Sequence, residues 1–273
     1  MTNRNELLIV SFGTTSAESR ELNIGAVEQS IADAAGDSFS ICRCFTSQTV
    51  INIIKKREGI CIDNIQEALE RAADQGVRNL AVQPLHLMKG LEYGKLQTIL
   101  SGYGNQFQSI SLGDPLLSSE DDFRKVAEAL IEASSEYDDG ETALVFMGHG
   151  TEAAANDIYI RLQEILSSME KHNYYIGTVE ARPSVGDVLS DIDKCHYRRA
   201  VLRPLMLVAG NHAVRDMASG DDPDSWFSLF TASGYETECI IEGLGQIPAI
   251  RDIYVSHAMK AIQSLNSRSV PDR

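Results

Sequence analysis

Two histidines in the second half of the chain each follow an apolar run and have a glycine one or two residues away. His149 lies in the segment MGHGT and His212 lies in the segment AGNHA. Small residues around a histidine let the backbone turn sharply and let a bulky ligand approach the imidazole. Such a histidine can bind a metal ion, act as a general base, or only shape a turn. The residue types therefore indicate metal or acid–base chemistry and leave the structural alternative open.

Two carboxylates complete this set of candidates. Glu180 closes the apolar run 175–180, where a charge loses hydration unless it meets a cation or serves a site. An ion pair with Arg182 is the simpler alternative for Glu180. Glu92 is the second carboxylate, and its alternative role is to stabilise a helix N-terminus from solvent. Imidazoles suit borderline metals such as Co2+, Ni2+, Zn2+ and Fe2+, and a carboxylate can accept a proton.

An internal repeat places these residues in equivalent positions. The segments VQPLHLMKGLEY (82–93) and LRPLMLVAGNHA (202–213) share the pattern P-L-x-L-x-x-G, and their alignment puts Glu92 at the position of His212. The segments LLIVSFGTT (7–15) and ALVFMGHGT (143–151) are also alike and occur in the same order. The shared order indicates a duplicated chain.

The pattern of apolar runs predicts which elements hold the site. Several runs are apolar throughout and alternate with amphipathic stretches, which is typical of parallel strands buried on both faces in an α/β fold. The predicted strands are 7–12, 39–45, 77–84, 107–112, 142–147, 175–180, 199–207 and 237–241. The predicted helices are 62–75, with Asp63 as a possible N-cap and Gly76 as a C-cap, 121–134, 156–171 and 247–265.

Two similar Rossmann-like domains follow from the repeat, and we expect them to be residues 1–138 and 139–273. The boundary is placed in the acidic stretch 136–141, and the sequence leaves open whether the final helix packs on the first domain. Parallel α/β sheets bind ligands at the carboxyl ends of their strands. A cleft between the two domains, lined by those ends, is therefore the expected binding site.

The charge of the chain excludes one class of partner. The net charge is −15, and nucleic-acid binding needs clustered Lys and Arg, so no nucleic-acid partner is expected. An anionic ligand would instead need local cations. The candidates near the repeat motifs are Lys89, Lys95, Arg203 and Arg215, with Lys89 and Arg215 preferred for substrate binding, although any of them could only balance neighbouring acids.

The cysteines and the lengths of the apolar runs indicate where in the cell the protein is located. The five cysteines form no CxxC motif and are expected to be buried, reduced thiols. The N-terminus shows no apolar signal segment, and no run is long enough for a membrane span. We therefore expect a cytoplasmic protein with no membrane partner, and a homo-oligomer is possible.

These motifs together resemble the class II chelatases, and most closely the anaerobic sirohydrochlorin cobaltochelatases. The resemblance spans nearly the whole chain through SFGTT, LHLMKGLEY, MGHGT, VEARPS, PLMLVAGNHAVRDM and EGLGQIP. It implies insertion of Co2+, as a substrate metal without a prosthetic group, into sirohydrochlorin or precorrin-2. It also implies that His149, His212 and Glu180 bind the metal and that His149 and Glu92 are catalytic.

Other functions stay open at this point. The chain could be a two-lobed protein that binds metal or tetrapyrrole without catalysis, or a chelatase whose physiological metal is Fe2+ or Ni2+. A hydrolase with His149 as base is disfavoured because the chain has no GxSxG motif. His86 is expected to lie in the core or in the wall of the cleft, and the other histidines are expected to be structural or solvated.

Overall fold

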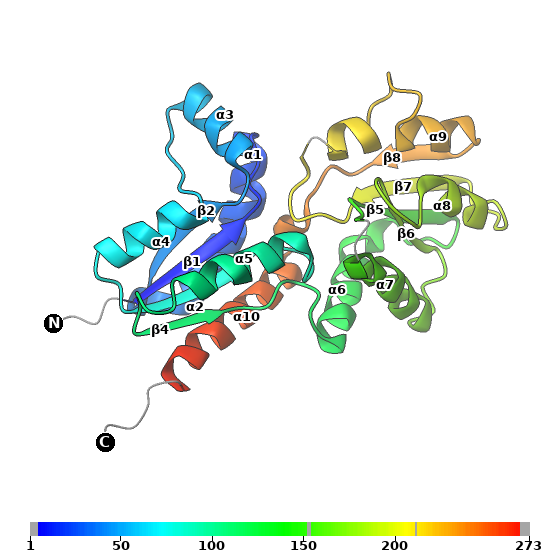
Figure 1. The fold of residues 1–273 in the computed structure, drawn as a ribbon. Helices are drawn as coiled ribbons and strands as arrows, with labels where there is room; N and C mark the ends of the chain where they lie inside the picture. The colour runs from blue at the N-terminus through cyan, green and yellow to red at the C-terminus, as the bar shows by residue number, and fades with distance from the viewer. Residues whose placement is uncertain (1–4, 152–153, 211, 268–273) are drawn as a thin grey trace. The chain divides into compact units, whose positions relative to one another are not determined.

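Two compact units make up the chain (Figure 1). The computed structural model describes residues 5–151, 154–210 and 212–267. Unit 1 contains the described residues up to Ser118 and those from Arg251 onward, and unit 2 is Ser119–Ile250. The last helix, α10 (Pro248–Ser267), therefore belongs almost entirely to unit 1.

The boundary lies earlier in the chain than the acidic stretch 136–141. Helix α6 (Glu120–Ala133) packs against α7 (Asp157–Ser168), and Arg161 of α7 donates from Nε to Glu120 at 3.1 Å. Arg203 donates to the carbonyl of Ala133. These contacts tie α6 to unit 2, so the acidic stretch is a turn inside that unit.

Unit 1 is built on a four-stranded parallel sheet in the order β2-β1-β3-β4. Its strands are β1 (Asn5–Ser11), β2 (Ser40–Phe45), β3 (Asn79–Pro84) and β4 (Ser109–Leu112). Its other helices are α1 (Ala17–Ser19), α2 (Ala26–Ala35), α3 (Gln48–Glu58), α4 (Ile65–Asp74) and α5 (Leu91–Gly102), with a π-helical turn at Arg20–Gly25 before α2. Helix α10 lies beside β4, because Ser111 Oγ donates to the carbonyl of Ala261 at 2.7 Å.

Unit 2 repeats this arrangement in the order β6-β5-β7-β8, again with parallel strands. The strands are β5 (Thr142–Gly148), β6 (Tyr174–Thr178), β7 (Arg199–Pro204) and β8 (Glu236–Cys239). The helices of unit 2 are α6, α7, α8 (Val185–Ile192) and α9 (Trp226–Ala232). A π-helical turn occupies Ala213–Met217. The predicted fold of two similar parallel α/β units is confirmed.

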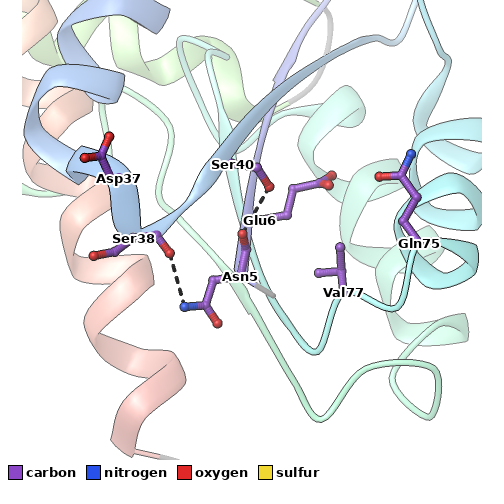
Figure 2. Close-up of a pocket in the computed structure, with 7 residues that line it drawn as sticks. All are labelled: Asn5, Glu6, Asp37, Ser38, Ser40, Gln75 and Val77. Atoms are coloured by element: carbon purple, nitrogen blue, oxygen red, sulfur yellow. Dashed lines mark hydrogen bonds between the residues drawn. The ribbon is translucent and has the colours of Figure 1, made fainter. Parts of the chain in front are cut away.

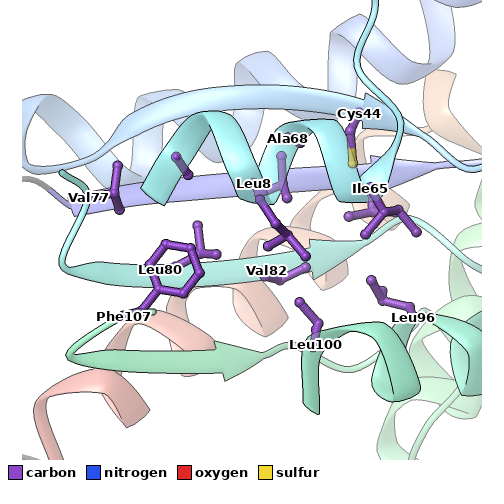
Figure 3. Close-up of a cluster of buried hydrophobic side chains, with 13 residues drawn as sticks. Leu8, Cys44, Ile65, Ala68, Val77, Leu80, Val82, Leu96, Leu100 and Phe107 are labelled. Atoms are coloured by element: carbon purple, nitrogen blue, oxygen red, sulfur yellow. The ribbon is translucent and has the colours of Figure 1, made fainter. Parts of the chain in front are cut away.

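The central strands are apolar because both of their faces are buried. Leu8 and Val10 of β1 pack with Leu80 and Val82 of β3 under helices α4 and α5 (Figure 3). The intervening residue Leu7 is equally buried on the opposite face. All seven residues of β5 are buried in the same way. Full burial of both faces explains why the strands could be found as continuous apolar runs.

The ends of the central strands are held alike in the two units. Leu85 N donates to the carbonyl of Val10 at 2.7 Å in unit 1, and Leu205 N donates to the carbonyl of Met147 at 2.7 Å in unit 2. Each bond lies directly after the proline that ends β3 or β7. The repeat read from the sequence is therefore also a repeat of backbone structure.

Helix α4 shows where local sequence signals were read correctly and where they were not. Gly76 has a φ of 70°, as a glycine beyond a helix C-terminus requires. The N-cap is Asn64, which forms a capping box with Glu67, and not Asp63. Asp63 instead accepts from Arg71 Nε at 2.8 Å.

The cysteines differ in their exposure to solvent. Cys61 and Cys195 are exposed, so the expectation of burial was wrong for them, while Cys44 is buried. No helix within the described residues combines the length and apolarity needed to cross a membrane.

Candidate metal site

His149 follows β5 directly, and its position is fixed by the glycines on either side. A Cβ on Gly148 would lie 2.3 Å from the ring of Tyr159, and Gly150 has a φ of 85°. Tyr159 Oη also accepts from Gly150 N at 3.3 Å. Gly148 is therefore needed for close packing on Tyr159, and Gly150 is needed for the left-handed backbone. The His149 side chain between them is partly exposed to solvent.

The Nδ1 atom of His149 lies near two oxygen atoms. It lies 3.1 Å from the carbonyl of Gly150 and 3.4 Å from Oε2 of Glu180. Both groups are acceptors, so a neutral ring carries its proton on Nδ1. The lone pair of Nε2 is then available to a metal ion.

His212 lies next to His149 in the same unit. The two ring centroids are 4.6 Å apart, and the planes meet at 82°. Nδ1 of His212 contacts the carboxylate of Asp216, one helical turn further along the chain. Here too the carboxylate accepts from Nδ1, which leaves Nε2 free.

Glu180 lies two residues beyond the end of β6, which stops at Thr178 and not at Glu180 as predicted. Its backbone N–H donates to the carbonyl of His149 at 2.9 Å, which fixes the distance between the two segments. Arg182, the alternative partner of Glu180, lies 3.6 Å from Asp187 instead. The Glu180 side chain is 57% exposed, so it can reach a ligand from solvent.

The structure thus brings three of the predicted residues together as two pairs, His149 with His212 and His149 with Glu180. Within the described parts of the chain, no three His, Cys, Asp or Glu side chains converge tightly enough to enclose a metal ion.

Glu92 belongs to unit 1, where it lies in the first turn of α5. Burial raises the pKa of Glu92, but Lys95 at 2.7 Å and its positive charge outweigh this effect and hold the pKa below its usual range. Glu92 is therefore a carboxylate at neutral pH and able to accept a proton. Burial also lowers the pKa of the neighbouring His86 to about 4, so this imidazole is neutral.

The four candidate cations differ in their surroundings. Lys89 pairs with Asp114 at 2.7 Å, and Lys95 pairs with Glu92. Arg203 is only 5% exposed and is held by Glu242 and α6, which makes it a structural cation. Arg215 is exposed and has no ion-pair partner among the residues that the structure describes. Arg215 is therefore the cation most accessible to an anionic ligand.

Asp216 is a partner of His212 that was not predicted from the sequence. The signal was present, since Asp216 follows His212 at a spacing of four residues in HAVRD, which places both on one face of a helical turn. A carboxylate on the second ring nitrogen orients a metal-binding histidine and raises its basicity.

We predict that Asp216→Ala weakens Co2+ binding by about tenfold to 100-fold, the range typical of losing such a partner. Asp216→Asn keeps an oxygen that can accept from Nδ1 of His212, so its loss of Co2+ affinity should be smaller. Calorimetric titration with Co2+ measures both, and equal affinities in wild type and Asp216→Ala would remove Asp216 from the site.

A polar pocket at the amino ends of the strands in unit 1 does not suit the same chemistry. Figure 2 shows it at the amino ends of β1 and β2, where Asn5 donates to the carbonyl of Ser38 at 3.2 Å and Ser40 donates to the carbonyl of Asn5 at 3.1 Å. Among the described residues, its lining contains the acids Glu6 and Asp37 and no base.

Comparison with known proteins assigns the family. The family model described as cobalt chelatase (CbiK) matches residues 5–263. A sirohydrochlorin cobaltochelatase of Salmonella typhimurium is 37% identical over 256 residues, covering 94% of this chain and 96% of that protein. The sirohydrochlorin cobaltochelatase CbiKC of Nitratidesulfovibrio vulgaris is 31% identical over 75% of this chain and 72% of its own.

Among solved structures, SirB from Bacillus subtilis with Fe3+ aligns with a TM-score of 0.66 at 14% identity, covering 98% of this chain and 100% of that one. CbiX, described as the terminal enzyme of siroheme biosynthesis in denitrifying bacteria, aligns with a TM-score of 0.56 at 15% identity, covering 94% and 98%. At these identities the two structures show the shared fold alone.

Proposed function

Because the chain belongs to the cobalt chelatase family, we propose that it is a sirohydrochlorin cobaltochelatase, which inserts Co2+ into sirohydrochlorin or precorrin-2 during anaerobic cobalamin biosynthesis. The observation that carries the proposal is the pair of imidazoles, His149 and His212, whose ring centroids lie 4.6 Å apart and whose Nδ1 atoms each contact an acceptor oxygen. Co2+ is a substrate here, and no prosthetic group is needed.

The roles of the residues follow from their chemistry. His149 and His212 bind the incoming Co2+ as neutral imidazoles, and Glu180 adds a negatively charged ligand. A metal held by few protein ligands keeps positions open for the nitrogens of the macrocycle. Insertion releases two pyrrole protons as the metal–nitrogen bonds form. Glu92, which is ionised at neutral pH, is the proposed acceptor of one of them, and the second passes to solvent water.

The test of this function is a turnover assay. Sirohydrochlorin and Co2+ are mixed in large excess over the protein, and the absorbance of the metallated macrocycle is followed. A catalyst produces many equivalents of product per protein. A protein that only binds metal or tetrapyrrole stops at one equivalent, and that result would reject the proposal. Parallel assays with Fe2+ and Ni2+ compare the metals, which imidazole ligands alone do not discriminate.

Arg215 and Lys89 are proposed to bind the carboxylates of the tetrapyrrole. Arg215→Gln should raise the KM for sirohydrochlorin by about threefold, in the range of one exposed ion pair, and leave the KM for Co2+ unchanged. Lys89→Gln should have a smaller effect, because Lys89 already pairs with Asp114. Steady-state kinetics with each substrate varied in turn measures both, and a larger change in the KM for Co2+ would contradict this assignment. The cytoplasmic location and a possible homo-oligomer stay predictions.

A further inference from the structure

The end of β1 in unit 1 has the same backbone as the end of β5 in unit 2, but a different side chain. Phe12 takes the place of His149, since each follows the central strand and precedes a glycine with a left-handed backbone. The φ angles are 89° at Gly13 and 85° at Gly150. A phenylalanine therefore stands where unit 2 presents a metal-binding imidazole.

A second ligand position has changed in the same way. Ser47 N donates to the carbonyl of Phe12 at 3.4 Å, as Glu180 N donates to the carbonyl of His149 at 2.9 Å. Serine thus replaces the carboxylate, and in the repeat alignment only Glu92 keeps a side chain that could bind metal. Unit 1 carries the frame of the metal site without its ligand set.

Apolar side chains are exposed at these same positions. Three large hydrophobic residues in the described parts of the chain are more than half exposed, namely Leu91 at 69%, Phe12 at 57% and Val214 at 52%. Leu91 directly precedes Glu92, and Val214 is two residues from His212. Single exposed hydrophobic residues are ordinary. Phe12 and Leu91 both belong to unit 1, where Phe12 occupies the position of His149 and Leu91 precedes the position of His212, and this placement suits contact with an apolar ligand surface.

We propose that Phe12, with Leu91 beside Glu92, contacts the flat apolar face of the tetrapyrrole substrate. This inference rests on the proposed function, which supplies a ligand with a large conjugated ring and carboxylates at its rim. An aromatic side chain suits the ring, because offset stacking adds to the gain from apolar burial.

Phe12 can be replaced without disturbing the core. The turn itself packs on Phe45, whose ring would lie 2.5 Å from a Cβ on Gly13, whereas the Phe12 side chain faces solvent. A purely structural role for Phe12 would show as a loss of thermal stability and not as a loss of ligand affinity.

The test is an equilibrium titration with sirohydrochlorin and no metal, followed by its absorbance or fluorescence. Phe12→Ala should raise the Kd by roughly tenfold. Phe12→Tyr keeps the ring and should stay close to wild type. Ile60→Ala is the matched control, because Ile60 is 46% exposed but lies in the connection between α3 and α4. Co2+ affinity should be the same in all of these proteins.

An unchanged Kd in Phe12→Ala, or an equal loss in Ile60→Ala, would overturn the inference, and so would a wild type that does not bind sirohydrochlorin. If Phe12→Ala does not fold, Phe12→Leu decides, because it removes the ring and keeps apolar volume. A wild type that binds sirohydrochlorin without turnover would reject the proposed function, and the comparison of Kd values would still decide the role of Phe12.

Discussion

Replacing His149 by alanine should lower kcat for Co2+ insertion by at least about 100-fold, because loss of a direct ligand should exceed the effect of losing an outer-shell partner. His212→Ala should act similarly, since the two rings lie together and each offers Nε2. Thermal unfolding should change little, because both side chains are partly exposed, at 43% and 42%. Steady-state turnover and a melting curve on each variant check this.

His196→Ala is a suitable control for this experiment. His196 is exposed and precedes β7, at the opposite end of that strand from His212. Its removal should leave kcat and Co2+ affinity unchanged. Near-normal turnover in both His149→Ala and His212→Ala would show that the metal binds elsewhere.

The second large effect is expected for Glu180→Gln, which is nearly isosteric but uncharged. The KM for Co2+ should rise by about tenfold, because a charged ligand to the incoming cation is lost. The melting temperature should stay the same, since Arg182 pairs with Asp187 and does not depend on Glu180. Metal titration measures the role of Glu180 as a metal ligand, and thermal unfolding measures a structural role as an ion-pair partner.

Arg182→Gln is the matched variant for Glu180. If Glu180 had only a structural role, Glu180→Gln would reduce thermal stability and leave Co2+ affinity unchanged. Arg182→Gln would then have the same effect on stability. On the present assignment, Arg182→Gln leaves Co2+ affinity unchanged.

All eight strands could be predicted from the sequence. The central strands, such as β1 and β5, are apolar runs buried on both faces, whereas the edge strand β8 is partly polar and partly exposed. Four of the longer helices were predicted, whereas α2, α3, α5, α8 and α9 were not. In α5, glycines at positions 94 and 102 weaken the helical pattern. Strand ends were less certain. β7 stops at Pro204 although the apolar run continues to 207, because the chain turns directly after the proline.

The domain boundary and the capping of α4 depended on contacts that local sequence does not contain. An acidic, glycine-containing stretch resembles a linker, but the packing of α6 on α7 is a long-range contact. Asp63 and Asn64 are both good N-caps, and only the ion pair of Asp63 with Arg71 decides between them.

The site shows the same division. The repeat and the glycines led to the prediction of His149, His212 and Glu92 as site residues, because constraints on the backbone are visible in the sequence. The hydrogen-bond and ion-pair partners of the candidate side chains were not predicted from the repeat or the glycines. Asp216 on His212, Lys95 on Glu92 and Asp187 on Arg182 became evident only from the structure.

The most direct measurement follows a single transfer of cobalt. The protein is loaded with one equivalent of Co2+, mixed rapidly with sirohydrochlorin, and observed in both the cobalt bands and the macrocycle bands. We predict that the spectrum of imidazole-bound cobalt disappears, and the metallated macrocycle appears, with one and the same rate constant. We also predict that this cobalt spectrum is absent from the His149→Ala, His212→Ala double variant. Product that forms at the wild-type rate in the double variant, or cobalt that stays on the protein while product forms, would contradict the account.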